Sequence, residues 1–355
     1  LTGKAWACKS PFLRYICQHT KKKHIVLAPT GIAAINAGGA TLHSFFKLPF
    51  HPLIPTDSRF SNRNIKGTLK YNGEKCKILR EVELIIIDEI SMVRADIIDF
   101  IDKVLRIYSR NMRVPFGGKQ LLLVGDIYQL EPVLKEEDRQ FLRPFYTSAY
   151  FFDAHVFREM QLVSIELRKV YRQTDPTFIN ILDHIRTNNV ADADLALLNN
   201  RVGASGEKHS NELSITLSTR RDTVDYINEK QLAQLPGDPS VFIGEIKGDF
   251  PESSLPTPIQ LDLKVGAQVI FIKNDLDKRW VNGTLGIIEA IDEAEQMLYI
   301  VTDDGREFEV EKAVWSNVRY SFNEKEQKIE EEEIGVYTQF PIRLAWAITV
   351  HKSQG

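Results

Sequence analysis

LIIIDEISM, residues 84–92, decides which fold this chain is expected to adopt. Its first four residues are apolar and three of them are β-branched, which is typical of a strand buried on both faces of a parallel sheet. Asp88 and Glu89 follow where that strand should end, and ligands of open α/β sheets bind at the carboxyl ends of the strands. Carboxylates in this position hold magnesium and activate water in nucleoside triphosphatases. Taken alone, the pair fits a surface Asp-Glu after a core strand equally well, so the other motifs must decide.

The bulk composition narrows the class of protein. The 355 residues predict two or three domains, and 43% hydrophobic with 26% charged residues is typical of a globular chain. A net charge of -3 and a pI near 6.3 exclude a uniformly basic nucleic-acid binder, but not a basic groove on an acidic body. The three cysteines are scattered, which predicts neither a zinc site nor a disulfide framework. No apolar run approaches the roughly 18 residues of a membrane span.

The chain opens with LTGKAWACKS, which resembles a phosphate-binding loop of the form G-x-x-x-x-G-K-[ST]. Gly3, Lys9 and Ser10 are in register, and Cys8 stands where the second glycine is expected. That glycine lets backbone N–H groups close around phosphates, so a side chain at Cys8 is expected to crowd the loop, and Trp6 adds bulk. The alternative is a lysine at a helix start with no phosphate role.

Two more strands are expected to be buried and to end in small or polar residues. Residues 24–27, HIVL, lead into APTGIAA, a turn followed by an alanine-rich helix. Residues 121–124, LLLV, lead into GDIYQLEPV, in which the amide of Gln129 is suited to hydrogen-bond a terminal phosphate or its attacking water. Three strand ends with such residues favour a catalytic edge over a surface Asp-Glu pair.

TLHSFF, residues 41–46, combines hydroxyls, an imidazole and two adjacent aromatic rings. These groups suit contacts to phosphates and unstacked bases, although burial of Phe45 and Phe46 in the core is an equally good interpretation. Residues 47–77 are polar, basic and contain several prolines, which predicts an excursion from the sheet in the form of a loop or a small subdomain.

The second half predicts another α/β unit interrupted by β-structure. A strand over 215–220 and a helix from 224 are expected, and Arg172 in LRKVYRQ is either a phosphate-neutralising guanidinium or part of a surface basic cluster. From about Leu261, short strands and turn signals such as DDG at 303–305 predict a small barrel. TVHKSQG, residues 349–355, then brings polar groups together after an apolar segment.

In order and spacing, these motifs resemble those of superfamily 1 class B DNA helicases, specifically the Pif/RecD family. The matching pieces are GKAWACKS, APTGIAA, TLHSFF, LIIIDEISM, PFGGKQLLLVGDIYQLEPV, LRKVYRQ and AITVHKSQG. They run from the first residues to the last, so the resemblance covers essentially the whole chain. The PFGG segment is characteristic of the Pif branch.

The resemblance implies an α/β fold of two RecA-like P-loop NTPase domains with an inserted small β-barrel of the Src-homology-3 type. The first domain would span residues 1–160 with an insertion at about 47–77. The second would comprise 161–260 and 335–355, and the barrel 261–334. The chain lacks an initial methionine and stops inside a motif, so we expect a fragment.

The resemblance also implies an activity. It is that of an ATP-dependent helicase that moves 5′ to 3′ on single-stranded DNA and unwinds duplexes in DNA repair, recombination or telomere and genome maintenance. ATP and Mg²⁺ would be its cofactors, and single-stranded and forked duplex DNA its partners, with no membrane association and a monomeric state. Its compartment would be the cytoplasm and nucleoid of a bacterium, or the nucleus or mitochondrion of a eukaryote.

Site residues follow from the same resemblance, position by position. Ser10 and Asp88 would bind magnesium, and Glu89 would polarise the attacking water. The catalytic residues would be Lys9, Glu89, Gln129 and Arg172. The nucleotide-binding residues would be Gly3, Lys4, Ala5, Lys9, Ser10, Asp88, Gln129 and Arg172. The DNA-binding residues would be Pro29, Thr30, His43, Phe45, Thr349, His351 and Lys352.

Two other functions stay open. A catalytically disabled helicase scaffold would bind single-stranded DNA without hydrolysing ATP, because the loop is altered at Trp6 and Cys8. The presence of Asp88, Glu89, Gln129 and Arg172 favours a local lesion of an otherwise intact site instead. A metal-dependent nuclease built on the Asp-Glu pair would need more carboxylates around a metal pair, and the sequence offers no such set.

Overall fold

The computed structural model describes residues 1–3, 9–49, 51–167, 175–202, 213–326 and 328–350. The chain divides into two compact units. Unit 1 comprises Leu1–Arg201 and Val318–Glu332, and unit 2 comprises Val202–Asn317 and Glu333–Gly355. Compact units need not coincide with domains, so the domain boundaries predicted from the resemblance stay predictions.

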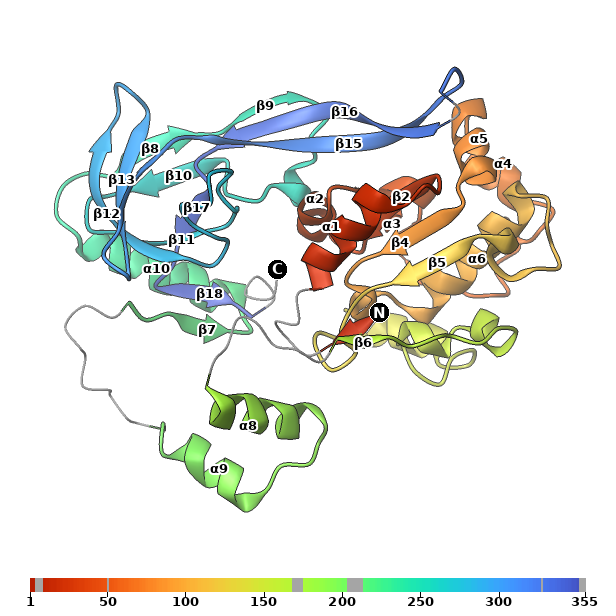
Figure 1. The fold of residues 1–355 in the computed structure, drawn as a ribbon, viewed down its shortest axis with the longest axis horizontal. Coiled ribbons are helices and arrows are strands. Elements are labelled where there is room, and N and C mark those ends of the chain that lie inside the picture. Colours follow the sequence, from red (N-terminus) through yellow and green to blue (C-terminus); the bar gives the residue numbers. More distant parts are fainter. Residues whose placement is uncertain (4–8, 50, 168–174, 203–212, 327, 351–355) are drawn as a thin grey trace. The chain divides into compact units, whose positions relative to one another are not determined.

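Unit 1 is built on a four-stranded parallel sheet in the order β3-β2-β4-β5 (Figure 1). Its strands are β2 (His24–Ala28), β3 (Ala40–Thr41), β4 (Leu84–Ile87) and β5 (Gln120–Leu123). Val26 lies opposite Ile86, which lies opposite Leu122. The three strands expected from the sequence are therefore confirmed to within one residue, and they are parallel neighbours. β2 and β4 are buried as predicted, whereas β5 is at most partly buried.

Helices cover both faces of this sheet because alternate strand residues point to opposite sides. Ile25 and Ile85 face a large core that α6 (Ala95–Tyr108) helps to build, whereas Val26 and Ile86 pack with Leu13 of α1. The remaining helices and 3-10 turns of unit 1 are α1 (Lys9–His19), α2 (Gly31–Ala37), α3 (Leu42–Phe46), η1 (Ser58–Phe60), α4 (Ile65–Leu69), α5 (Gly73–Glu81), η2 (Ile90–Met92), η3 (Pro115–Gly118), α7 (Glu136–Leu142), η4 (Phe151–Asp153) and η5 (His155–Arg158). The predicted excursion at 47–77 contains η1, α4 and the start of α5, joined by turns and irregular segments.

Two short strands extend unit 1 beside β5. β1 (Thr2–Gly3) pairs in parallel with β6 (Glu166–Leu167). The amino group of Leu1 donates to the carbonyl oxygen of Leu123 at 2.7 Å, so the start of the chain lies against the end of β5. This places Leu1–Gly3 beside the carboxyl end of β5.

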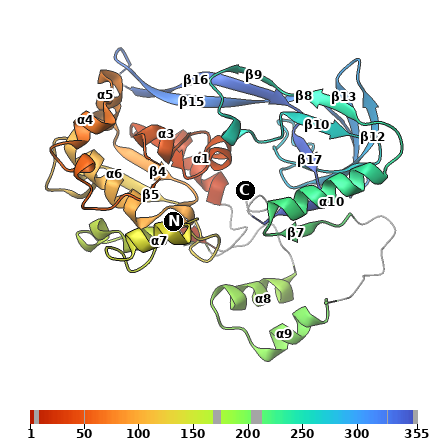
Figure 2. The ribbon, with the colours of Figure 1, turned by 180° about the vertical axis from the view of Figure 1, so that it is seen from behind.

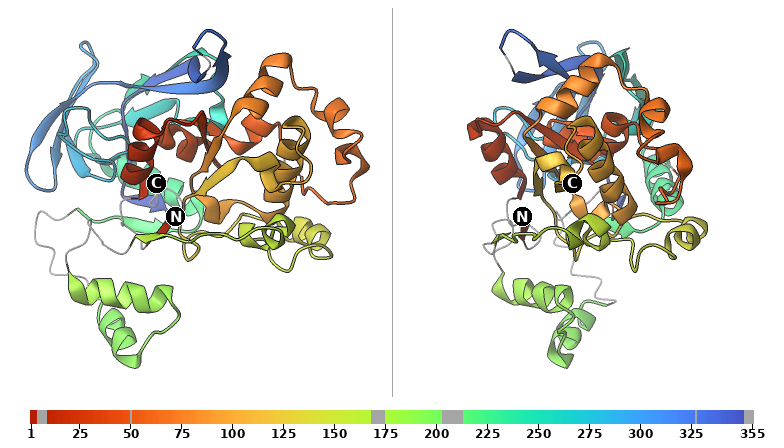
Figure 3. Two further views of the ribbon diagram at one scale, coloured as in Figure 1. Left: turned by 45° about the vertical axis from the view of Figure 1, so that its right-hand side comes forward. Right: turned by 90° about the vertical axis from the view of Figure 1, so that its right-hand side faces the viewer.

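A helical pair completes the first stretch of unit 1. α8 (Pro176–Arg186) and α9 (Asp192–Asn199) lie side by side (Figure 3), joined by a 2.8 Å contact between His184 Nδ1 and Asp194 Oδ2. Asp175 caps α8 by accepting hydrogen bonds from the N–H groups of Thr177 and Phe178. The cap fixes where α8 begins, and Arg186 is its last residue.

Unit 2 contains the second α/β element that the sequence predicts. β7 (Thr216–Ser218) pairs in parallel with β18 (Ala347–Thr349), and α10 (Arg221–Gln234) packs along both strands (Figure 2). The side-chain amide of Asn228 donates to the carbonyl of Ala347 and accepts from its N–H, each at 2.9 Å. This clamp fixes the strand that leads into the TVHKSQG motif.

The rest of unit 2 is antiparallel β-structure. A five-stranded sheet has the order β14-β13-β12-β11-β17, β8 pairs with β10, and β9 pairs with β16 of the β15–β16 hairpin. The bounds are β8 (Ser240–Ile243), β9 (Glu245–Gly248), η6 (Glu252–Ser254), β10 (Gln260–Leu263), β11 (Gln268–Phe271), β12 (Leu285–Asp292), β13 (Met297–Thr302), β14 (Glu307–Val310), β15 (Ala313–Asn323), β16 (Lys328–Gln339) and β17 (Ile342–Leu344). Strands thus begin before the predicted limit at 261, and a closed barrel stays a prediction.

The tip of the β15–β16 hairpin, Val318–Glu332, belongs to unit 1. Tyr320 is buried, and its hydroxyl accepts from the N–H of Val26 at 2.9 Å and donates to its carbonyl at 3.0 Å. β3 pairs with β2 only at Leu27 and Ala28, so Val26 has no strand partner on that side of the sheet. The Tyr320 hydroxyl takes the place of such a partner for the N–H and carbonyl of Val26. No described helix combines the length and apolar character that crossing a membrane requires.

Candidate functional site

The carboxyl end of β4 delivers the Asp-Glu pair as the sequence predicts. Asp88 continues the ladder by donating its N–H to Leu27, and its carboxylate accepts the N–H of Glu89 at 3.0 Å. Glu89 has φ 49° and ψ 44°, a left-handed backbone conformation that residues other than glycine rarely adopt. Backbone strain of this kind concentrates at functional sites because the surrounding structure must hold it in place. Here it turns the chain sharply out of the sheet.

A lysine faces this pair from the start of α1. The ammonium of Lys9 donates to the carbonyl oxygen of Gly3 at 3.3 Å. Burial lowers the pKa of Lys9, while the nearby carboxylates of Asp126, Glu89 and Asp88 raise it again. Three carboxylates from two strand ends therefore surround one cation.

Burial raises the pKa of both carboxyl groups of the pair. For Glu89 the negative charge of Asp88 adds to this rise, and Lys9 opposes it. For Asp88 the hydrogen bond from Glu89 and the charge of Lys9 oppose the rise. A carboxylate with a raised pKa is a better proton acceptor. Two desolvated carboxylates beside a single lysine also fit a magnesium ion, which prefers oxygen ligands supplied by one or two carboxylates and by phosphates.

The loop after β5 forms the third side of the site. Asp126 is 1% exposed and accepts from the Gln129 side-chain amide at 3.3 Å and the Tyr128 N–H at 3.2 Å. A Cβ on Gly125 would lie 2.9 Å from Cγ2 of Ile90, so a glycine lets this loop approach η2 closely. The structure thus brings Gln129 to the same edge as Lys9 and Glu89.

Sequence reasoning missed two residues at this edge. Asp126 has a recognisable signal, because it lies in the GD turn that follows the strand at 120–123, much as Asp88 follows β4. Arg186 has none: it lies 60 positions further along the chain and reaches Asp126 Oδ1 with Nε and Nη2, each at 3.3 Å. Only the folding of α8 brings it there.

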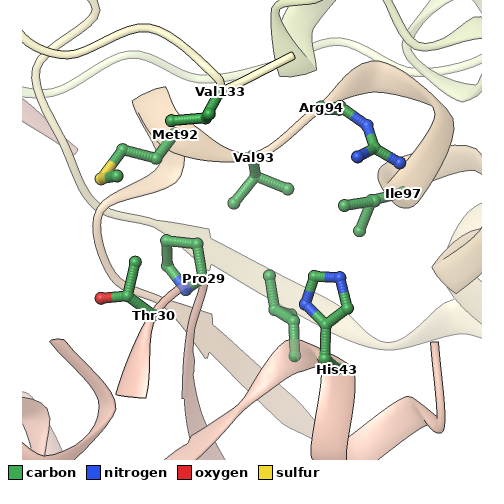
Figure 4. A pocket seen from close by; sticks show the side chains of 9 residues that line it. Pro29, Thr30, His43, Met92, Val93, Arg94, Ile97 and Val133 are labelled. Atoms are coloured by element: carbon green, nitrogen blue, oxygen red, sulfur yellow. The ribbon is translucent and has the colours of Figure 1, made fainter. Parts of the chain in front are cut away.

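A separate pocket of about 160 Å³ lies in unit 1 and is shown in Figure 4. It contains Pro29, Thr30 and His43, three of the residues predicted to contact DNA. The other lining residues are Leu42, Met92, Val93, Arg94, Ile97 and Val133. Apolar walls with a few polar groups at the rim suit the flat face of a base together with its phosphate.

The polar groups of this pocket are held in place. Thr30 caps α2, its hydroxyl accepting from the N–H of Ala33 at 3.2 Å. Burial lowers the pKa of His43, the positive charge of Arg94 lowers it further, and Asp96 opposes both. The imidazole is therefore neutral near pH 7. Arg94 is itself paired with Asp96 at 2.8 Å, so its charge is compensated.

Phe45, predicted to contact DNA, is buried in this structure, and its contact with DNA stays a prediction. Phe45 is 3% exposed and packs edge-to-face with Phe46, with ring centres 4.9 Å apart. The ammonium of Lys75 lies 3.1 Å from the centre of the Phe45 ring, so protein groups pack against this ring. Burial of the ring in the core is the interpretation that fits this structure.

Thr349, a further predicted DNA contact, lies in unit 2. It is only 8% exposed at the end of β18.

Several predicted site residues lie outside the described part of the chain. They are Lys4, Ala5, Arg172, His351 and Lys352, together with the altered loop positions Trp6 and Cys8. The side chain of Ser10 is also not described. Among the residues that are described, no group of three or more His, Cys, Asp or Glu is placed to hold a metal ion, so none of them adds support to the nuclease hypothesis.

The fold and the edge residues together define a P-loop nucleoside triphosphatase with RecA-like architecture. A lysine begins the helix after β1, an Asp-Glu pair ends β4, and an amide follows β5. Comparison with known families then gives the particular group. The chain belongs to the PIF1-like helicase family, whose model matches residues 1–196.

Individual relatives agree with this assignment. The ATP-dependent DNA helicase PIF1 of Danio rerio is 33% identical over 369 residues, covering 100% of this chain and 52% of that protein. The ATP-dependent DNA helicase Pif1 of Campylobacter jejuni is 32% identical, covering 94% of this chain and 75% of that protein. The crystal structure of Bacteroides sp Pif1 in complex with ADP-AlF4 superposes with a TM-score of 0.90 at 43% identity, covering 99% of this chain and 79% of that one. The chain thus spans about half the length of the Danio rerio relative.

Proposed function

We propose that this chain is the motor of an ATP-dependent DNA helicase, hydrolysing ATP with Mg²⁺ and moving 5′ to 3′ on single-stranded DNA to unwind duplexes. The observation that carries the proposal is the placement of Lys9 among Asp88, Glu89 and Asp126 at the carboxyl edge of the unit 1 sheet. The family assignment supports the same reading, as do relatives named ATP-dependent DNA helicases.

In this proposal each edge residue has one task. Lys9 binds the β- and γ-phosphates as a point charge, and Gln129 hydrogen-bonds the γ-phosphate without adding charge. Glu89 orients the attacking water and accepts its proton, which its raised pKa favours. Asp88 holds the magnesium ion, with Ser10 and Arg172 assigned to the same site by resemblance. The bound ion would neutralise charge that develops on the phosphates.

The unit 1 pocket around Thr30 and His43 is the proposed DNA contact. Its apolar walls would receive a base, while the threonine hydroxyl and the neutral imidazole would hydrogen-bond the backbone. Structures titled as Bacteroides Pif1 bound to ssDNA, and as forked dsDNA unwinding by two coordinating Pif1 helicases, each match this chain at 42% identity and a TM-score of 0.62. They support single-stranded and forked DNA as the substrates proposed here.

The biological setting is proposed from the family alone. The relatives come from bacteria and from eukaryotes, so the nucleoid of a bacterium and the nucleus or mitochondrion of a eukaryote are the compartments proposed. DNA repair, recombination and telomere or genome maintenance are the corresponding processes. Whether the motor acts as a monomer would follow from measuring its mass on a forked substrate.

DNA-stimulated ATP hydrolysis by the 355-residue chain is the test. Turnover should rise with single-stranded DNA and fall about 10²- to 10⁴-fold in Glu89→Gln, the range for loss of a general base. Glu137→Gln is the matched control, because Glu137 is an exposed carboxylate in the first turn of α7. Single-stranded DNA binding without any turnover would overturn the proposal in favour of the disabled scaffold. Nucleotide-independent cleavage of DNA would instead point to a nuclease.

A further inference from the structure

Arg186 connects the helical pair of α8 and α9 to the nucleotide edge. Its side chain is 14% exposed, and its guanidinium donates from Nε and Nη2 to Oδ1 of Asp126, each at 3.3 Å. The guanidinium carbon also lies 4.7 Å from the ring centre of Tyr128. Other carboxylates are further away, with Glu166 at 3.9 Å and Asp183 at 4.0 Å. Asp126 is therefore the principal partner of Arg186.

Asp126 in turn holds Gln129. One carboxylate oxygen accepts from Arg186 and from the N–H of Tyr128, and the other accepts from the Gln129 side-chain amide at 3.3 Å. Because Asp126 is 1% exposed, water does not compete for these positions. The orientation of the Gln129 amide thus depends on a carboxylate whose own position depends on Arg186.

The charges at the edge explain why Asp126 needs this partner. A buried carboxylate without a cation is costly, and Lys9 is already shared among three carboxylates. Arg186 is close enough to Lys9 for its positive charge to lower the lysine pKa. A planar guanidinium donates hydrogen bonds through a rigid fork, so it fixes the orientation of the carboxylate that it binds more firmly than an ammonium does.

We propose that Arg186 is a positioning residue for recognition of the γ-phosphate: it acts through Asp126 to hold the amide of Gln129 toward the nucleotide. This inference rests on the proposed ATPase function. It predicts that Arg186 affects the binding of a triphosphate but not of a diphosphate. A role confined to stability would change both alike.

The test compares ADP with the β,γ-imido analogue of ATP, and adds ATP turnover, in four forms of the chain. These are the unsubstituted chain, Arg186→Gln, Gln129→Ala and the double variant. Arg186→Gln should weaken analogue binding and lower kcat roughly tenfold, the effect of one hydrogen bond, while ADP affinity changes less than about twofold. In the Gln129→Ala background the same substitution should change analogue affinity less than about twofold, because its effect passes through Gln129.

Two further variants sharpen the result. Arg186→Lys keeps the charge but loses the fork, so it should recover only part of the analogue affinity. It also replaces Arg186→Gln in the cycle if the latter does not fold, which a loss of ADP binding would reveal. Arg139→Gln is the matched control, since Arg139 is exposed and pairs only loosely with Glu136 at 3.5 Å.

The outcomes separate the two proposals. Additive effects of Arg186→Gln and Gln129→Ala, or equal losses for ADP and the analogue, would overturn the positioning role while leaving the ATPase intact. An unsubstituted chain that neither hydrolyses ATP nor distinguishes the analogue from ADP would overturn the proposed function, and the positioning role with it.

Discussion

Replacing Tyr320 with phenylalanine should loosen the central sheet of unit 1. The change removes one hydroxyl that bonds both the N–H and the carbonyl of Val26, at 2.9 and 3.0 Å. Val26 is 4% exposed, so water does not take over these bonds. The ring itself stays, including its edge-to-face contact with Phe45 at 6.0 Å. Leaving buried polar groups unpaired costs about 1–3 kcal/mol each, so the two groups of Val26 give about 2–6 kcal/mol here.

Amide hydrogen exchange at Val26 is the appropriate assay. A chain with two compact units need not unfold in one step, so a local probe is more informative than a melting temperature. Protection of the Val26 amide should fall roughly 30- to 20,000-fold, the equivalent of that free energy. Tyr226→Phe is the control, because Tyr226 is 62% exposed. Unchanged protection in Tyr320→Phe would refute the idea that the hydroxyl completes the hydrogen bonding of β2.

Two other predictions concern titratable groups in unit 1. Burial lowers the pKa of Lys75 from 10.5 to about 7. Each pKa unit corresponds to about 1.4 kcal/mol, so the cation–π contact with Phe45, worth about 2 kcal/mol, is too weak to offset the cost of burying the charge. The unfolded chain keeps the Lys75 proton up to higher pH than the folded chain, so burial of the charged lysine destabilises the fold fully below pH 7, and this cost disappears as pH rises toward 10.5. Lys75→Met should therefore increase the free energy of urea unfolding most below pH 7, with Lys66→Met as the control. A gain in stability that does not change with pH would contradict this prediction. His43→Asn should weaken single-stranded DNA binding without changing the slope of log Kd against log salt at pH 7.5, because the imidazole is neutral; a slope change of about one would show a charged contact.

Much of unit 1 was readable in the sequence because its signals are local. Short apolar runs predict strands, and the strands at 24–28, 84–87 and 120–123 are confirmed, although the last is at most partly buried. Parallel strands end at a common edge, so residues that follow them are expected to meet. Asp88, Glu89 and Gln129 do so.

Other features depend on which elements pack together. TLHSFF suited DNA contact and core equally well, and only the packing around Phe45 decided for the core. The β-texture from about Leu261 was visible, but its start at Ser240 and its division into a five-stranded sheet and a long hairpin were not. Strand propensity carries no information on the choice of partner strand, since that depends on side-chain packing across the sheet.

By itself, the sequence determined the motif order, the strands of the catalytic edge and the residue types that end them. The tertiary structure alone decided that Arg186 pairs with Asp126, 60 positions away, and that Tyr320 completes the bonding of Val26, 294 positions away. The physical reason is one of range. Periodicity and turn chemistry act over a few residues and leave a mark in the sequence, whereas a buried ion pair or hydroxyl bond forms only after the chain has folded and water has been excluded.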